Sequence, residues 1–491
     1  MDSQCLTALS RRQFMPTLGA FVAGSALSHT AGGSAINVDG FRQLFIDDHV
    51  IAQMQSVRRT FHAAKRHEAN PIIHGDHPWL DGFAYLYGSV ERHPETDKLR
   101  LWYMSRFKKA GKFVWTMCLT ESADGIRWTV PKLGLVPDRH GSRQNNMVMS
   151  TETHSGFDEC LTPVRDPQPA NPVRRYRSLF WANDNGFRGT YSAWSADGVK
   201  WHNDRKALFN DTGDAGSIMY DVYRGRWVFF ARPLDNQISR AVSFSRDFQK
   251  WTPLNVIFQA DKAKRENFYN MQGFCYEGLY LGTVTIQWEE SGRYALEPHL
   301  ALSRDCENWR WVNQPKAFIP HGPHGSWEEF NTQMSAGNPI RMGDQLYFYY
   351  SGRTYPHSPY YWRGRDELVP KASVEPDVNI GLATLRVDGF VSLDAHYGGG
   401  SVETKPLNFT GKKLSLNCAA AHGEILVEVL DASGKIIPGF ARQDCLPVCQ
   451  DKIIQPVAWK THQTLANLKG KPVKLRFYLN RASLYSFEIT A

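Results

Sequence analysis

The sequence lacks the short motifs that would assign a function directly. It contains no phosphate loop, no Gly-x-Gly-x-x-Gly dinucleotide fingerprint and no Gly-x-Ser-x-Gly nucleophile elbow. It also lacks runs of like charge: the net charge is +8, yet the densest basic spots are pairs such as Arg58-Arg59 and Arg174-Arg175. A nucleic-acid-binding protein usually concentrates its basic residues on a stripe or a tail. We therefore expect no nucleic-acid partner.

Long hydrophobic runs are absent too. No segment beyond the N-terminus approaches 18 consecutive apolar residues, so we expect no membrane span in the mature protein. The N-terminus carries "SRRQFM" (residues 10–15) before the weakly apolar "PTLGAFVAGSALS", which is typical of a signal peptide. Ser-Arg-Arg-x-Phe resembles the twin-arginine export signal, although Pro16 stands where a Lys is common. We expect residues 1–35 to engage the twin-arginine export machinery and the protein to be periplasmic or secreted from a bacterium.

Cysteine is scarce, with eight residues in 491, and the cysteines are dispersed. This pattern predicts no disulfide framework. Cys445 and Cys449 form the one close pair, for which free thiols are favoured over a disulfide, although an oxidising compartment would allow one. The histidines near the candidate site loops do not form a His-x-x-x-His cluster, so we predict no metal site and no cofactor.

One seven-residue phrase is repeated along the chain. "SADGIRW" begins at Ser122 and "SADGVKW" at Ser195, and looser copies begin at Ser245 and Ser303. All four copies share Ser-x-Asp-x-x-x-Trp. Such a phrase is typical of a tight turn, because the Asp accepts backbone N–H bonds, a Gly takes positive φ freely and the Trp ring folds back onto the sheets. We expect Asp124, Asp197, Asp247 and Asp305 to be structural rather than catalytic.

Each phrase is preceded by a strand, a polar turn and an aromatic-rich strand, and a fifth such hairpin, "NPIRMGDQLYFYYSG", follows the last copy. Five repeated four-stranded units predict an all-β, five-bladed β-propeller, because radial stacking buries both faces of each small sheet. We place it at residues 36–395, with "LFIDDHVIA" and "RRTFHAA" closing the last blade. Alternating strands after residue 395 predict a small C-terminal β-sandwich, residues 396–491.

With these units in hand, the chain resembles secreted bacterial proteins of the glycoside hydrolase family 32/43-like group. The segments that carry the resemblance include "PWLDG", "LRLWYMS", "ESADGIRW", "ENFYNM", "GSWEEF", "YYSGRTYPH" and "GLATLRVDGFVSL". The resemblance implies a five-bladed propeller with a C-terminal sandwich, and carboxylates around a central funnel. The tripeptide Arg165-Asp166-Pro167 also occurs in that family. The repeat layout places Asp166 in a turn after a strand, so we interpret it as structural.

An acidic residue precedes the first hairpin strand of every unit. From these acids we propose Asp81 as base or nucleophile, Asp214 as orienting carboxylate and Glu266 as general acid, because Phe268 and Tyr269 would desolvate Glu266. Nearby aromatic, amide, cationic and acidic side chains predict contacts to a carbohydrate substrate. These are Trp79, Asp158, Arg232, Tyr269, Asn270, Gln272, Trp327, Glu328 and Glu329. Arg232 or Arg353 could bind a carboxylated sugar such as a uronate.

The leading hypothesis is therefore an exported glycosidase that acts on an oligosaccharide or polysaccharide. Three alternatives stay open at this point. The same funnel could bind carbohydrate without catalysis, it could belong to a polysaccharide lyase acting on uronates, or the protein could be a cell-surface scaffold with no small ligand. Two funnel carboxylates on either side of a glycosidic bond would favour hydrolysis.

Overall fold

The computed structural model describes residues 35–491 except 155–156, 158–160, 185–186, 205, 235–237, 265, 291–292, 315, 335–336 and 357–377. Within these residues the chain is built from β-strands, and its helices are three-residue 3₁₀ turns. The predicted all-β class is confirmed. No helix in this part of the chain has the length and apolar character needed to cross a membrane.

Three separate antiparallel sheets of four strands follow the predicted hairpin units. The first contains β6 (Tyr85–Arg92), β7 (Leu99–Lys109), β8 (Lys112–Ser122) and β9 (Met147–Ser150). The second contains β10 (Val164–Arg165), β11 (Tyr176–Asp184), β12 (Phe187–Ser195) and β13 (Trp201–Asn203). The third contains β14 (Ser217–Asp221), β15 (Arg226–Ala231), β16 (Ser239–Ser245) and β17 (Asn255–Gln259).

The fourth and fifth predicted units share one nine-stranded sheet, in which a parallel bridge between Leu296 and Asn331 joins two antiparallel blocks. The first block holds β18 (Glu266–Tyr276), β19 (Leu279–Glu290), β20 (Arg293–Ser303) and β21 (Trp309–Trp311). The second holds β22 (Asn331–Met334), β23 (Ile340–Met342), β24 (Gln345–Arg353), β25 (Val378–Arg386) and β5 (Lys65–Arg66). Because two units share a sheet, the count of five blades stays a prediction.

Aromatic residues fill the spaces between successive units. Trp102 of β7 meets Tyr176 of β11 at 5.9 Å between ring centroids, and Phe230 of β15 meets Trp309 of β21 at 5.8 Å. The last unit also packs against the first, because Tyr349 of β24 lies 5.5 Å from the ring of Trp128. Large rings between neighbouring sheets explain the high Trp content, and they close the units into a ring.

The four Ser-x-Asp phrases form the predicted turns. In every copy one Asp oxygen accepts the backbone N–H groups two and three residues later, at 2.7–2.9 Å. The fourth position of the phrase has positive φ in all four copies, and Gly fills it in the two strict ones. The register places these turns at the end of each sheet opposite to the start of its first strand. The structural interpretation of the four aspartates is confirmed.

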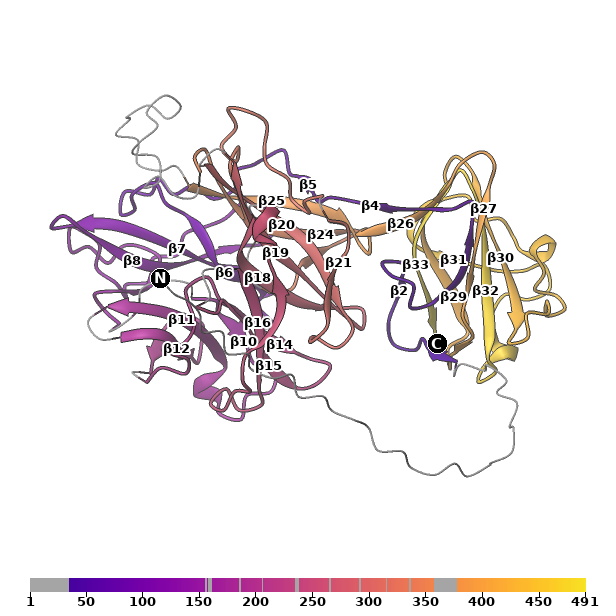
Figure 1. Ribbon diagram of the computed structural model, residues 1–491, viewed down its shortest axis with the longest axis horizontal. Helices are drawn as coiled ribbons and strands as arrows, with labels where there is room; N and C mark the ends of the chain where they lie inside the picture. Colours follow the sequence, from indigo (N-terminus) through magenta and orange to yellow (C-terminus); the bar gives the residue numbers. More distant parts are fainter. Residues whose placement is uncertain are drawn as a thin grey trace, which may run out of the picture.

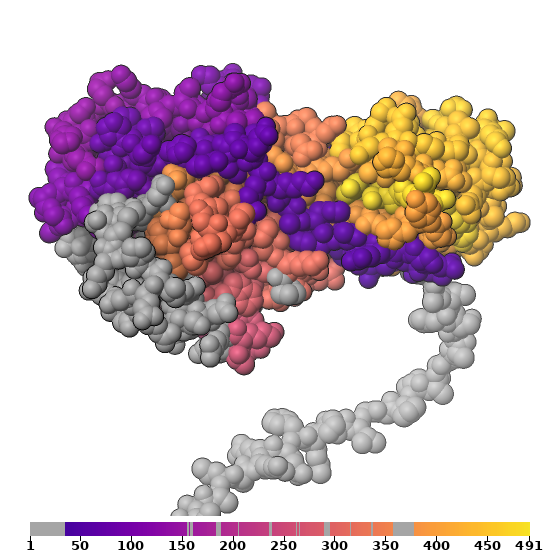
Figure 2. Space-filling view, turned by 90° about the horizontal axis from the view of Figure 1, so that it is seen from above, coloured from indigo at the N-terminus to yellow at the C-terminus, as the bar shows by residue number. Residues whose placement is uncertain are grey.

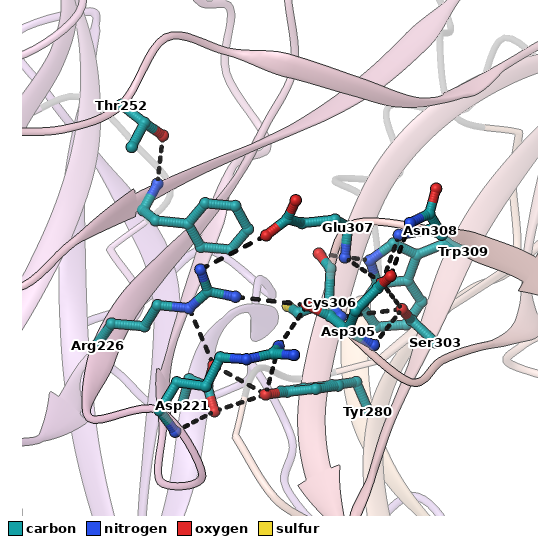
Figure 3. Close-up of polar contacts among 12 residues, drawn as sticks. Asp221, Arg226, Thr252, Tyr280, Ser303, Asp305, Cys306, Glu307, Asn308 and Trp309 are labelled. Atoms are coloured by element: carbon teal, nitrogen blue, oxygen red, sulfur yellow. Dashed lines mark hydrogen bonds and ion pairs between the residues drawn. The ribbon is translucent and has the colours of Figure 1, made fainter. Parts of the chain in front are cut away.

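The turn at Asp305 also ties the third sheet to the fourth unit (Figure 3). The carbonyl oxygen of Asp305 accepts Arg226 at 3.4 Å, and Arg226 Nε donates to Asp221 at 3.1 Å. The hydroxyl of Tyr280 donates to Asp221 at 2.9 Å. Asp166 has a similar local role, since its side chain accepts the N–H of Gln168 at 2.9 Å, as expected of a turn residue.

Two six-stranded sheets form the second lobe (Figure 1), and the side chains between them include Phe45, Trp459, Phe477 and Phe487. One sheet contains β1 (Ile36–Asn37), β3 (Ile51–Gln55), β27 (Gly400–Thr404), β28 (Leu407–Asn408), β30 (Glu424–Asp431) and β32 (Val473–Asn480). The other contains β2 (Gln43–Leu44), β4 (Arg58–Phe61), β26 (Val391–Ala395), β29 (Lys413–Ala419), β31 (Asp451–Pro456) and β33 (Ala482–Thr490).

The N-terminal strands differ from the expectation that they close the last blade. Strands β1 to β4 pair within the two sheets of the second lobe, and β5 alone pairs with β25. The reason is that Phe45, Val50 and Ile51 fill the core of that lobe. Figure 2 shows the N-terminal segment running from the first lobe onto the second. Cys445 is buried and Cys449 is exposed, and both are free thiols, as favoured from the sequence.

Candidate functional site

Side chains from three sheets meet at the start of the first strands. We call this group, Tyr85, Tyr87, Tyr269, Arg232 and Arg353, the central cluster. The rings of Tyr85 and Tyr87 lie 4.8 Å apart, and the ring of Tyr269 lies 6.4 Å from that of Tyr87. The guanidinium of Arg232 lies 5.7 Å from the Tyr269 ring, and that of Arg353 lies 4.2 Å from the Tyr85 ring. The central cluster is therefore a buried row of aromatic rings with a cation at each end.

Irregular strand pairing turns these tyrosines toward the centre. On β18, Phe268 pairs with Ile286 and Asn270 with Thr285, so Tyr269 is the extra residue of a bulge. On β6 the register shifts between Tyr85 and Ser89. Gly88 permits that shift, because a Cβ there would lie 1.8 Å from the carbonyl oxygen of Trp102. Bulges re-aim side chains in this way, often beside functional sites.

The predicted residues Asp214 and Arg232 form an ion pair at one end of the central cluster. Arg232 follows β15 and is 6% exposed, and its carbonyl oxygen accepts the N–H of Gly213 at 2.8 Å, which holds the Asp214 loop in place. The Asp214 side chain is 29% exposed. Asp214 is thus a carboxylate with a fixed orientation and access to solvent.

Three amide side chains on the first strands are buried without full hydrogen bonding. Among the described residues, Asn270 Oδ1, Gln272 Oε1 and both polar atoms of Asn331 have no hydrogen-bond partner. We call Asn270, Gln272 and Asn331 the inner amides. A buried polar group without a partner is costly, so such groups are rare unless a ligand, an ion or water completes them. Two of the inner amides adjoin residues of the central cluster. Asn270 follows Tyr269 in the sequence, and Asn331 pairs with Arg353 across the β22–β24 ladder.

Glu266 is the first residue of β18 and is buried at 3% exposure. Its Oε2 atom has no partner among the described side chains, and its Oε1 atom lies 3.9 Å from Lys264 Nζ. Burial raises the pKa of the Glu266 carboxyl above its usual range, although Lys264 opposes the shift. A carboxyl pKa raised above its usual range is a property required of a general acid.

Asp81 and Trp79 contact residues of the first sheet and its loops. One Asp81 oxygen is paired with Arg139, and the other accepts the backbone N–H of Lys108 at 2.5 Å. The Trp79 ring stacks on His77 at 5.0 Å, and its N–H donates to Asn146 at 3.2 Å. Both side chains hold loops of the first sheet together.

Glu328 and Trp327 both contact Tyr350, which is not part of the central cluster. Glu328 is 2% exposed, lies 2.5 Å from Arg66 and accepts a hydrogen bond from Tyr350. Burial raises its pKa, which Tyr350 and Arg66 oppose. The Trp327 ring stacks on Tyr350 at 5.9 Å. Both residues therefore pack against β24.

Two further predicted contacts complete the set. Glu329 accepts the N–H of Gly325 at 2.8 Å and lies 2.7 Å from His324, so it organises its own loop. Asp158 lies outside the described residues. Within those residues, no group of three or more His, Cys, Asp and Glu side chains is placed to hold a metal ion.

The sequence prediction missed Tyr85, Tyr87 and Asn331. The first two form the pattern Tyr-x-Tyr at the start of a first strand, where alternate residues share a face. That pattern resembles ordinary core residues, so it gave no distinct signal. Gln333, which accepts a hydrogen bond from the Tyr85 hydroxyl, comes from a strand almost 250 residues further along the chain.

No family model and no curated protein matches the sequence. Solved structures with similar folds include a glycosyl hydrolase from Bacteroides ovatus, at 13% identity and a TM-score of 0.46 over 67% of this chain and 94% of that one. The catalytic domain of a Coprinopsis cinerea GH62 α-L-arabinofuranosidase has 14% identity and a TM-score of 0.43, over 66% and 97%. An N-acetylgalactosamine deacetylase from F. plautii has 15% identity and a TM-score of 0.38, over 73% and 97%. These similarities are too weak to assign an activity.

Proposed function

We propose that this protein is a carbohydrate-active enzyme and that the central cluster and the inner amides hold a glycan. The observation that carries the proposal is the combination of three tyrosine rings, two guanidiniums and three buried amides with unpartnered atoms. A sugar presents apolar C–H faces to aromatic rings and hydroxyls to amides and cations. A ligand site of this kind has apolar and aromatic walls with a few polar groups that fix orientation.

The reaction that these residue types support best is hydrolysis of a glycosidic bond. Glu266, whose pKa is raised by burial, is the candidate that donates a proton to the oxygen of the leaving sugar. A carboxylate then acts as nucleophile or takes a proton from the water that attacks the anomeric carbon. Asp214, oriented by Arg232, and Asp81, held by Arg139, are the candidates for that carboxylate. The signal peptide predicted at residues 1–35, which apart from Ala35 lies outside the described residues, would export the enzyme to the periplasm or beyond.

A panel of plant and algal polysaccharides tests this proposal. Purified protein should release reducing ends from at least one polysaccharide, and Glu266→Gln should abolish most of that release. Glu121→Gln is a matched control, because Glu121 pairs with Arg100 beside the Ser122 turn, at the opposite end of the sheet. Equal activity of Glu266→Gln and the unmodified protein would contradict the assignment of the acid. Separate Asp214→Asn and Asp81→Asn variants identify the second carboxylate.

A non-catalytic glycan-binding propeller is the second candidate. It is favoured by the occupied state of two of the three proposed catalytic carboxylates, since Asp81 has partners on both oxygens and Asp214 is paired with Arg232. Calorimetric titration with the same polysaccharides separates the two candidates. Binding without any release of reducing ends would favour this second candidate.

A further inference from the structure

Arg353 is a buried cation without a counter-ion in the described part of the chain. It is the last residue of β24 and is 7% exposed. Its guanidinium lies against the rings of Tyr85 and Tyr355, at 4.2 and 5.6 Å, and its Nε atom has no hydrogen-bond partner among the described residues. None of the described carboxylates lies within ion-pair distance of it. Arg232, at the other end of the central cluster, differs because Asp214 neutralises it.

The neighbouring Tyr269 does not supply the missing negative charge. Burial raises the pKa of the Tyr269 phenol well above its usual range, so this ring stays neutral at physiological pH. A buried charge is costly unless it is paired, and a cation over an aromatic face recovers part of that cost. Among the described residues, the position therefore has no anion to pair with Arg353.

Asn331 lies directly opposite Arg353 on the neighbouring strand. Residues that face each other across an antiparallel pair project from the same side of the sheet. Both polar atoms of the Asn331 side chain are buried without a partner among the described residues. A forked cation and an unsatisfied amide thus stand next to each other on one face of the sheet.

We propose that Arg353 and Asn331 bind an anionic sugar unit, so that the substrate is an acidic glycan carrying a carboxylate or a sulfate ester. Arginine suits this role because its planar fork donates two parallel hydrogen bonds to one carboxylate or sulfate. The neighbouring amide would bind a ring hydroxyl or a second anion oxygen. This inference rests on the proposed function, because it names the class of glycan that the central cluster accepts.

The test compares acidic glycans with their neutralised counterparts at constant ionic strength. Polygalacturonate and alginate are titrated against the carboxyl-reduced polymers, and a sulfated galactan against its desulfated form. The unmodified protein should bind at least one acidic polymer about ten- to one-hundred-fold more tightly than its neutral counterpart. A preference lost on carboxyl reduction identifies a uronate, and one lost on desulfation identifies a sulfate ester.

Variants assign the preference to the pair of residues. Arg353→Met should bind acidic and neutral forms equally, and Arg353→Lys should retain part of the preference, because it keeps the charge but loses the fork. Arg246→Met is the control, since Arg246 is exposed on a turn at the opposite end of the third sheet and should leave binding unchanged. Asn331→Leu should weaken binding of both forms.

Stability provides a readout that does not need a glycan. Arg353 is a buried cation that has no counter-ion among the described residues, so the melting temperature of Arg353→Met should be equal to or above that of the unmodified protein. A large decrease would show that Arg353 serves packing, and would overturn the inference. Equal affinity of the unmodified protein for acidic and neutral forms would overturn it too, while leaving the proposed function intact. Binding of no glycan at all would contradict the proposed function itself.

Discussion

The Asp305 turn lies at one end of the sheets and the inner amides lie near the other. The two regions differ in how fully their polar side chains are hydrogen-bonded. In the Asp305 turn both carboxylate oxygens are occupied, by two backbone N–H groups, by Ser303 and by the Asn308 side chain. Near the central cluster, by contrast, Asn331, Asn270 and Gln272 retain polar atoms without described partners. The contrast does not extend to every turn, because Trp251 Nε1 in the third Ser-x-Asp phrase also has no partner among the described residues. Buried polar groups without a partner are candidates for completion by a ligand or by water. This difference supports the proposal that the inner amides contact a substrate, whereas Asp305 holds the fold.

The largest expected effect is a loss of activity on substitution of the proposed general acid. Glu266→Gln should lower the rate of glycan hydrolysis by about 10²- to 10⁴-fold, the usual contribution of a general acid, without loss of folding. Initial rates of reducing-end release, with circular dichroism as the check on folding, measure this. Retention of more than half of the activity would contradict the role of Glu266 as the acid.

The pH dependence of stability provides a separate test of Glu266. Its folded pKa is raised, so its protonated form favours the folded state, and the stability it contributes is lost as pH rises through the folded pKa. Glu266→Gln should therefore raise the melting temperature at pH 7 by up to a few degrees, and the gain should vanish below pH 4. Melting curves across this range measure the difference. A lower melting temperature for the variant at pH 7 would contradict the shift.

The next largest effect is a loss of stability on substitution of a turn aspartate. Asp305→Ala leaves two backbone N–H groups without their acceptor and should destabilise the protein by about 1–3 kcal/mol. Denaturant unfolding measures the loss. The rate per folded molecule should stay unchanged, because the turn lies at the opposite end of the sheet. A specific loss of catalysis in a folded Asp305→Ala variant would contradict the purely structural role of the turn.

A matched pair of substitutions sharpens the contrast further. Ser303→Ala, in the turn, should destabilise the protein by about 1 kcal/mol, since Ser303 donates to Asp305 and accepts from Cys306. Asn331→Leu should cost less than that, or stabilise the fold, because it removes buried polar atoms that have no described partner. Thermal unfolding of both variants tests the order. The reverse order would mean that Asn331 is satisfied in the folded protein.

The smallest effect concerns an exposed ion pair of the first turn. Arg127 is 90% exposed and lies 2.9 Å from Asp124. Exposed pairs contribute little, so Arg127→Ala should change the free energy of unfolding by less than about 0.5 kcal/mol. A larger change in denaturant unfolding would show that the turn depends on more than its backbone hydrogen bonds.

Features that depend on neighbouring residues were predictable from the sequence, whereas most contacts between distant segments were not. The Ser-x-Asp turns and the hairpins depend on residues a few positions apart, so the all-β class and the structural role of Asp124 followed from pattern alone. The ion pair of Asp214 with Arg232 joins two segments whose residue types had been singled out. The pairing of Asp81 with Arg139 depends on a distant loop that no pattern specifies. Likewise, the pattern of "LFIDDHVIA" does not indicate that Phe45 fills the core of the second lobe.

The central claim is that the central cluster, and not the ring of turns, binds the glycan. Titration of one polysaccharide from the panel into two matched aromatic variants, Tyr269→Leu and Trp251→Leu, tests it most directly. Tyr269 lies in the central cluster, and Trp251 closes the third Ser-x-Asp turn. We predict that Tyr269→Leu weakens binding by about tenfold or more, while Trp251→Leu binds as the unmodified protein does. Weaker binding by Trp251→Leu with full affinity in Tyr269→Leu would contradict the claim.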